Sequence, residues 1–214
     1  MTRRGRVALK TAVWVGALAP LGWLLYRTVT DQLGANPIDE ITDRLGDWTL
    51  RLLLVSLTMT PLRLLFDLSW PVTLRRLLGL FAFFYASLHF SVWVVLDHFF
   101  DWPTMGADVV KRPYITVGMT ALLLLIPLAV TSTTGMIRRL GARAWRRLHR
   151  LVYLAAVAAV LHYLWLAKVG VLDPYWYAAA LAVLLGVRGW DVARRAVRRR
   201  RGRSVPGVSS PATP

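Results

Sequence analysis

Six long apolar segments limit what this chain can fold into. Each is close to the roughly 20 residues that an α-helix needs to cross the ~30 Å hydrocarbon core of a bilayer. The chain is 56% hydrophobic and 18% charged, and the charges collect between the apolar segments. The segments cover Val7–Val29, Thr49–Phe66, Arg76–Phe99, Tyr114–Val130, Leu148–Ala167 and Tyr175–Val192.

The connections between these segments are too short for a soluble domain, which usually has about 50 residues or more. The sequence therefore predicts one all-α integral membrane domain, a six-transmembrane helical bundle over residues 11–193. Apolar residues continue past Pro20, which favours an uncleaved first helix over a signal peptide. Residues 1–10 are predicted to form a basic cytoplasmic N-terminus, and the low-complexity residues 194–214 a disordered basic tail.

The charge distribution predicts the orientation of the bundle. Most of the 27 Lys and Arg residues fall on one side of the six segments, and nearly all of the 11 Asp and Glu residues fall on the other. Loops rich in Lys and Arg stay in the cytoplasm, so both termini are predicted to be cytoplasmic. The net charge of +16 then reflects topology and attraction to anionic membrane lipid. A nucleic-acid partner is not expected, because no separate basic fold is present.

Histidines in the apolar segments point to a cofactor. Three of the four histidines lie within these segments or at their edges. An imidazole at bilayer depth is costly unless it has a partner, so it indicates a functional site. The chain has no cysteine, which excludes iron–sulfur clusters and thiol chemistry. The partner that we expect is haem iron, which histidine binds axially.

Two of these histidines are predicted to lie at the same depth. At 1.5 Å per residue, His89 lies about 20 Å beyond Arg76 and His162 about 21 Å beyond Leu148, both in the outer half of the membrane. A solitary membrane histidine can simply hydrogen-bond a neighbour. Two at one level on separate helices can clamp a b-type haem as its axial ligands.

A second, inner site is less defined. His149 lies 13 residues before His162, which leaves the two rings about 140° apart on a straight helix. Arg75 lies 14 residues before His89, on nearly the same face and at the depth of His149. On pattern alone His149 could be an interfacial residue and Arg75 a positive flank of its helix. His98 is predicted to be an exposed residue of the outer loop and not a ligand.

Five blocks of the sequence resemble the MsrQ (YedZ) family, the haem-binding membrane subunits of periplasmic protein-methionine-sulfoxide reductase systems. The resemblance covers about residues 15–190 and also relates the chain to ferric-reductase-like membrane proteins, including NADPH oxidases. In that wider group the third and fifth helices commonly carry two histidines each, around two haems. Arg75 stands here at the fourth position, as in the MsrQ pattern. The blocks are GANPIDEIT (34–42), RRLLGLFAFFYASLHF (75–90), KRPYITVG (111–118), TSTTGMIRRLG (131–141) and WRRLHRLVYLAAVAAVLHYLWL (145–166).

The resemblance implies a multi-pass protein of the bacterial inner membrane that transfers electrons and is not itself the sulfoxide reductase. It implies one or two haem b groups, with His89 and His162 as outer ligands, and His149 and Arg75 at the inner site. It also implies FMN, a quinol or cytosolic flavin reductase as donor, and a periplasmic molybdopterin-containing catalytic subunit as acceptor. A quinol-oxidising cytochrome b subunit for another periplasmic oxidoreductase is the alternative. A proton or solute transporter is disfavoured, because the middle of the segments lacks Asp and Glu.

Overall fold

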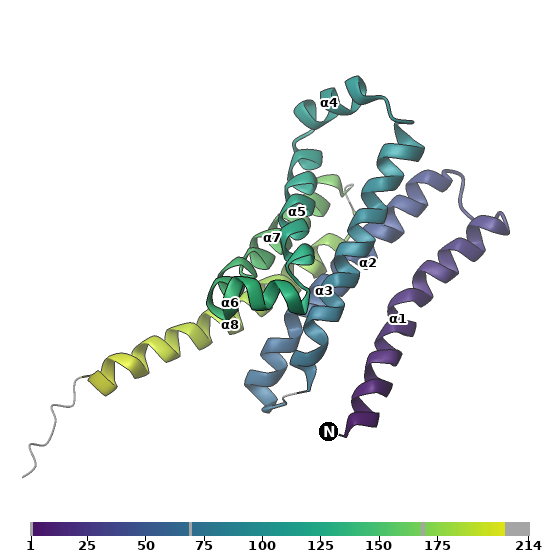
Figure 1. Cartoon of the computed structure of the whole chain (residues 1–214). Helices are drawn as coiled ribbons and strands as arrows, with labels where there is room; N and C mark the ends of the chain where they lie inside the picture. Colours follow the sequence, from purple (N-terminus) through teal and green to yellow (C-terminus); the bar gives the residue numbers. More distant parts are fainter. Residues whose placement is uncertain (1, 69, 168–169, 204–214) are drawn as a thin grey trace, which may run out of the picture.

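The computed structural model describes residues 2–68, 70–167 and 170–203, and the regular structure in these ranges is entirely helical. The prediction of an all-α protein is therefore confirmed. Long helices run side by side, and α4 lies at one end of the bundle (Figure 1). The helices are α1 (Arg3–Val29), α2 (Pro37–Phe66), α3 (Pro71–Val92), the π-helix η1 (Trp93–Asp97), α4 (Trp102–Lys111), α5 (Pro113–Val130), α6 (Thr134–Leu148), α7 (Leu151–Leu166) and α8 (Asp173–Arg203).

Proline and side-chain caps begin several of these helices. Pro37, Pro71 and Pro113 stand at the first turn of α2, α3 and α5. Proline has no N–H and a φ angle suited to a helix, so the first turn accepts it without losing a hydrogen bond. Asp101 accepts a hydrogen bond from the Thr104 amide at 3.2 Å and so caps α4. Local sequence thus determines where these helices begin.

Four helices in the described part of the chain are long and apolar enough to cross a membrane: α1, α2, α3 with η1, and α5. A fifth crossing is formed if α6 and α7 are taken together, as a pair bent by 46° at a short break. The sixth predicted segment lies in α8, which does not pass the same test of length and composition. Four or five candidate spans are therefore found, and six spans stay a prediction.

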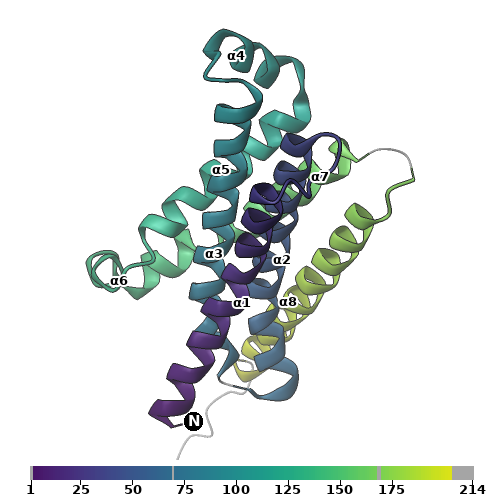
Figure 2. The same ribbon diagram turned by 90° about the vertical axis from the view of Figure 1, so that its right-hand side faces the viewer.

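Helix boundaries differ from the predicted segments in three places. α2 begins at Pro37, well before the second predicted segment, which starts at Thr49. The connection between the fourth and fifth predicted segments contains most of α6, which is divided by Gly141 in a left-handed conformation (φ 74°). Figure 2 shows α6 projecting sideways from the bundle. The fifth predicted segment, 148–167, starts too early, because α7 begins only at Leu151.

The predicted disordered tail also differs in part. α8 continues to Arg203, whereas composition predicts disorder from residue 194. Arginine is a good helix former, and the ion pair between Arg195 and Asp191 joins successive turns of the helix. Residues 204–214 of the predicted tail lie outside the described residues, as do 168–169 of the turn before α8.

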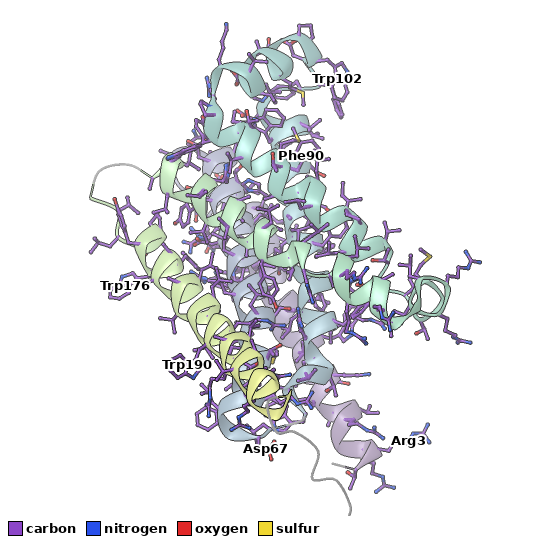
Figure 3. The ribbon with its side chains drawn as sticks, turned by 90° about the vertical axis from the view of Figure 1, so that its left-hand side faces the viewer. Arg3, Asp67, Phe90, Trp102, Trp176 and Trp190 are labelled. Carbon is purple, nitrogen blue, oxygen red and sulfur yellow. The ribbon has the colours of Figure 1, made fainter. Side chains whose placement is uncertain are left out.

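The core lies mainly between α2 and α3 and between α5 and α7. Small and branched side chains allow close contact there: Ala82, Ala155 and Ala156 are fully buried, and Leu53 is nearly so. Many large apolar side chains point outward instead, including Trp176 and Trp190 on α8 (Figure 3). Such an apolar exterior suits a protein surrounded by lipid.

Tyr85 holds the first helix against the bundle. Its side chain is fully buried on α3, and its hydroxyl donates to the Ala17 carbonyl of α1 at 2.6 Å. α1 buries only Ala17 and Leu24, so this bond is a large share of its attachment.

We expect Tyr85→Phe to lower the free energy of unfolding by about 1 kcal/mol, because one interhelical hydrogen bond is lost without a change in shape. Unfolding in detergent, followed by circular dichroism, measures the effect. Ser87→Ala is the control, since the Ser87 hydroxyl donates to the Phe83 carbonyl of its own helix. Equal stability of the two variants would contradict the assigned role.

Candidate functional site

His89 on α3 and His162 on α7 meet inside the bundle. Their ring centroids are 6.2 Å apart, and their ring planes are 82° from parallel. Both residues are partly buried. The prediction that these residues reach the same depth on separate helices is thus borne out by their contact.

Each of the two rings is oriented by a backbone carbonyl. The Nδ1 of His89 lies 2.9 Å from the Thr42 carbonyl oxygen, and the Nδ1 of His162 lies 2.7 Å from the Tyr114 carbonyl oxygen. A carbonyl only accepts, so each Nδ1 carries the proton and each Nε2 keeps a lone pair. This is the arrangement of metal-binding histidines, whose second nitrogen donates to a carbonyl or carboxylate.

The spacing of the two rings fits an intervening metal ion. A metal–imidazole bond is about 2.0–2.1 Å, and the ring centre lies about 1 Å beyond the nitrogen, so two rings on one metal ion have centroids about 6 Å apart. Among the described residues, no group of three or more His, Cys, Asp or Glu could hold an ion. Two histidines suffice for haem iron, because the porphyrin supplies the other four nitrogens.

Two glycines make room for these rings. A Cβ on Gly46 would lie 3.3 Å from His89 Nδ1, and a Cβ on Gly118 would lie 2.7 Å from His162 Nδ1. Each glycine follows by four residues the carbonyl that its histidine bonds, Thr42 or Tyr114. Helical geometry places residues i and i+4 one above the other. Both imidazoles therefore reach a carbonyl through the space left by a missing side chain.

The supporting residues Thr42, Tyr114, Gly46 and Gly118 were not predicted from the sequence. A backbone carbonyl leaves no signal in the sequence, and a glycine inside an apolar helix can equally serve close helix packing. The available signal was the position of both glycines within otherwise apolar helices, where glycine is unfavourable by about 1 kcal/mol relative to alanine.

His149 lies at the break between α6 and α7. Its ring stacks on Trp145 with centroids 3.9 Å apart, and its Nδ1 lies 3.1 Å from the Trp145 carbonyl oxygen. Its Nε2 is 3.4 Å from the Ser132 hydroxyl, which already donates its proton to the Leu128 carbonyl. The Leu128 carbonyl also acts on the His149 ring, so both ring nitrogens of His149 already have protein neighbours.

Arg75 lies near His149, as depth counting predicted. The Arg75 charge acts electrostatically on the His149 ring, and the Arg75 carbonyl accepts from the Ser56 hydroxyl at 2.9 Å. Because His149 lies at the 46° bend between α6 and α7, the 140° offset expected for one straight helix does not apply to it. His149 precedes α7 and does not share its helical phase.

The prediction that His98 is exposed was wrong. Its side chain is only 9% exposed, and its ring packs on Trp93. Nδ1 lies 3.2 Å from the Trp93 carbonyl oxygen, and Nε2 lies 3.2 Å from a carboxylate oxygen of Asp108. The π-helix and α4 together enclose the ring. Because both nitrogens have partners, His98 has no free lone pair to offer a metal ion.

The carboxylates of Asp101 and Asp108 stabilise the polar segment around His98 by hydrogen bonds and an ion pair. The hydroxyl and amide of Thr104 both donate to Asp101, and these bonds lower the pKa of the Asp101 carboxyl below its ordinary value. Asp108 also pairs with Arg112 at 3.3 Å. The carboxylates here serve the structure of α4.

Several known proteins are similar in sequence to this chain along most of its length. Residues 45–160 match the family described as the ferric reductase like transmembrane component. The chain is 53% identical over 202 residues to the protein-methionine-sulfoxide reductase heme-binding subunit MsrQ of Rhodospirillum rubrum, covering 94% of each chain. It is 54% identical over 183 residues to the MsrQ of Herminiimonas arsenicoxydans, covering 84% of each chain. The MsrQ of Caulobacter vibrioides is 48% identical over 184 residues, covering 86% of this chain and 88% of that one. The resemblance of the five blocks is thereby confirmed, and this chain belongs to the MsrQ family of ferric-reductase-like membrane proteins.

Proposed function

We propose that this chain is the electron-transfer subunit of a periplasmic methionine-sulfoxide reductase system, and that it holds haem b between His89 and His162. The observation that carries the proposal is the pair of rings whose centroids are 6.2 Å apart, each with its Nδ1 donating to a carbonyl. The names of the relatives, which specify a heme-binding subunit, support the same cofactor. A bound haem supplies a one-electron redox centre.

The protein's contribution to this site is orientation and environment. Thr42 and Tyr114 fix the tautomer of the two histidines and increase the basicity of Nε2. The surrounding apolar helices lower the local dielectric, which tunes the potential of a bound centre. His149 is the proposed ligand of a second haem, with Arg75 beside it, and a ligand at its Nε2 would replace the contact with the Ser132 hydroxyl. FMN is implied only by family resemblance.

We further propose six membrane crossings with both termini in the cytoplasm. α8 contacts α2 and α7 along the bundle, and its large outward side chains, such as Trp176 and Val183, are apolar. Arg3 and Asp67 lie at one end of the molecule and Trp102 at the other (Figure 3). The Arg-rich end would then face the cytoplasm, and His98 with α4 the periplasm.

In this orientation the chain would accept electrons from quinol or a cytosolic flavin reductase. It would deliver them across the inner membrane to a periplasmic molybdopterin-containing subunit that reduces methionine sulfoxide. The alternative of a quinol-oxidising cytochrome b for another periplasmic oxidoreductase uses the same site. The alternative of a transporter has less support, because the middle of the six apolar segments carries no Asp or Glu.

A reduced-minus-oxidised absorbance spectrum of the purified protein tests the haem. Bands of a six-coordinate b-type haem are expected, and a flat baseline would refute the proposal. Proteoliposomes test the relay. Electrons from an enclosed quinol or flavin reductase should reach an external methionine-sulfoxide reductase only when this chain is present. Transfer only to an unrelated periplasmic oxidoreductase would favour the alternative.

The angle between the two imidazoles predicts an electron paramagnetic resonance signature. Their planes are 82° from parallel, and near-perpendicular axial imidazoles leave the iron d orbitals close in energy. We expect the oxidised protein to give the strongly anisotropic low-spin signal of that geometry. The narrower rhombic signal of parallel imidazole planes would contradict this arrangement of His89 and His162.

A further inference from the structure

An unusual group of cations lies near the proposed inner site. Arg188, on α8, is partly buried, and its guanidinium lies 4.9 Å from the centre of the Tyr153 ring on α7. Arg75 on α3 and Arg150 at the start of α7 are both close enough to act electrostatically on Arg188. Arginine side chains from α3, from α8 and from the start of α7 thus lie near one another.

This positive charge is not balanced by the described part of the chain. Neither Arg75 nor Arg188 forms a salt bridge with a described residue. Asp191 acts on Arg188, but its carboxylate is bound by Arg195 at 3.0 Å. Arg150 is exposed, whereas Arg75 and Arg188 are partly buried, and like charges in such positions repel one another and raise the free energy of the fold unless an anion accompanies them.

Tyr153 supplies an independent observation. Its hydroxyl is buried and has no hydrogen-bond partner among the described residues, and it is the one such side-chain atom there. An unsatisfied buried hydroxyl costs about 1–3 kcal/mol, so a bound partner is expected for it. Tyr153 lies under the Arg188 guanidinium, and the Arg75 charge acts on both Arg188 and His149. The unpaired donor and the unpaired cations therefore adjoin the same proposed site.

We infer that Arg75, Arg188 and Tyr153 form a binding site for the anionic group of an inner cofactor. This inference rests on the proposed function, because the cofactor is the one that His149 would bind or adjoin. A carboxylate or a phosphate fits, since arginine donates to either in a planar fork and tyrosine adds a third donor. The first would be a haem propionate and the second a flavin phosphate. α8 then belongs to the cofactor site, in addition to its packing role.

The test compares three variants of the full chain, each reconstituted with haem b and FMN in detergent. Arg188→Ala removes the cation, and Tyr153→Phe removes only the orphan hydroxyl. Arg198→Ala is the matched control, an exposed arginine further along α8. Haem-to-protein and flavin-to-protein ratios are measured over a range of cofactor concentrations, together with thermal unfolding of the protein without cofactors.

We expect Tyr153→Phe to weaken binding of the inner cofactor about tenfold, because a hydrogen bond to a charged group is lost. Without cofactor it should be as stable as the original chain or more stable. Arg188→Ala should weaken binding by about tenfold or more, Arg188→Lys should retain part of the affinity, and Arg198→Ala should leave it unchanged. If only the affinity for haem changes, the bound anionic group is a haem propionate. If only the affinity for FMN changes, it is the flavin phosphate.

Several results would overturn the inference. These are unchanged affinities in Tyr153→Phe and Arg188→Ala, an equal loss in Arg198→Ala, or a change confined to bound anionic lipid. An original chain that holds only the haem of His89 and His162, and no flavin, would also contradict it. An original chain that binds no haem at all refutes the proposed function itself, so the two failures are distinguishable.

Discussion

His162→Ala is expected to abolish the haem bound between α3 and α7. The substitution removes one of two Nε2 ligands, and the remaining His89 cannot hold a six-coordinate iron alone. Loss of a supporting hydrogen bond to a metal ligand already costs about 10–100-fold in affinity, so loss of the ligand itself should cost more. The reduced-minus-oxidised spectrum of the purified variant should lose the corresponding bands.

His98→Ala is the control for this prediction. Both nitrogens of His98 are bonded to protein, and its side chain is 9% exposed, so the variant loses a buried residue without losing a proposed ligand. It should keep its haem-to-protein ratio while its unfolding temperature falls. Identical spectra for His162→Ala and His98→Ala would refute the ligand assignment. If His89→Ala retained the bands, the pairing of the two histidines would be refuted.

Gly118→Ala is expected to disable the same site without touching a ligand. The new Cβ would lie 2.7 Å from His162 Nδ1 and 2.9 Å from its Cε1, closer than Cβ atoms in proteins approach other heavy atoms. The ring must move away from the Tyr114 carbonyl, which breaks the bond that orients it. Overpacking costs about 1–3 kcal/mol. The misdirected Nε2 should lower haem affinity about 10–100-fold, as measured by haem titration.

Two other glycines provide a graded comparison. A Cβ on Gly46 would lie 3.3 Å from His89, so Gly46→Ala should have a smaller effect of the same kind. A Cβ on Gly186 of α8 meets nothing within 4 Å, and Gly186→Ala should stabilise the helix by about 0.5–1 kcal/mol. If Gly118→Ala and Gly186→Ala bound haem equally well, the close packing of His162 on α5 would not matter for the site.

Periodicity and hydropathy predicted the helical class and the approximate course of α1, α3 and α5. They also predicted that His89 and His162 would meet, because helical rise fixes depth once a segment spans the membrane. They failed where a helix extends past the apolar region, as at Pro37 of α2. Hydropathy marks the depth of the bilayer, whereas a helix continues as long as its backbone hydrogen bonds are satisfied.

His98 and His149 show the limit of local pattern in opposite ways. His98 follows an apolar segment beside Asp97, which is typical of an exposed loop, yet α4 folds back over it and pairs it with Asp108. His149 belongs to a continuous run of helix-forming residues, yet α6 ends at Leu148 and the next helix, α7, is bent by 46° relative to it. His98 is covered by the helix that follows it, α4, and His149 lies at a bend that its local composition does not reveal.

The sequence by itself determined that this chain is a helical membrane protein with histidines at bilayer depth, since apolar length and helical rise are properties of each segment taken alone. Only the tertiary structure decided which nitrogen of each imidazole is free, because that depends on carbonyls of Thr42 and Tyr114 from other helices. It also decided that Gly46 and Gly118 admit those rings, and that Arg188 stands over Tyr153. Chemistry at these sites arises from contacts between helices, and such contacts follow from packing that no single segment encodes.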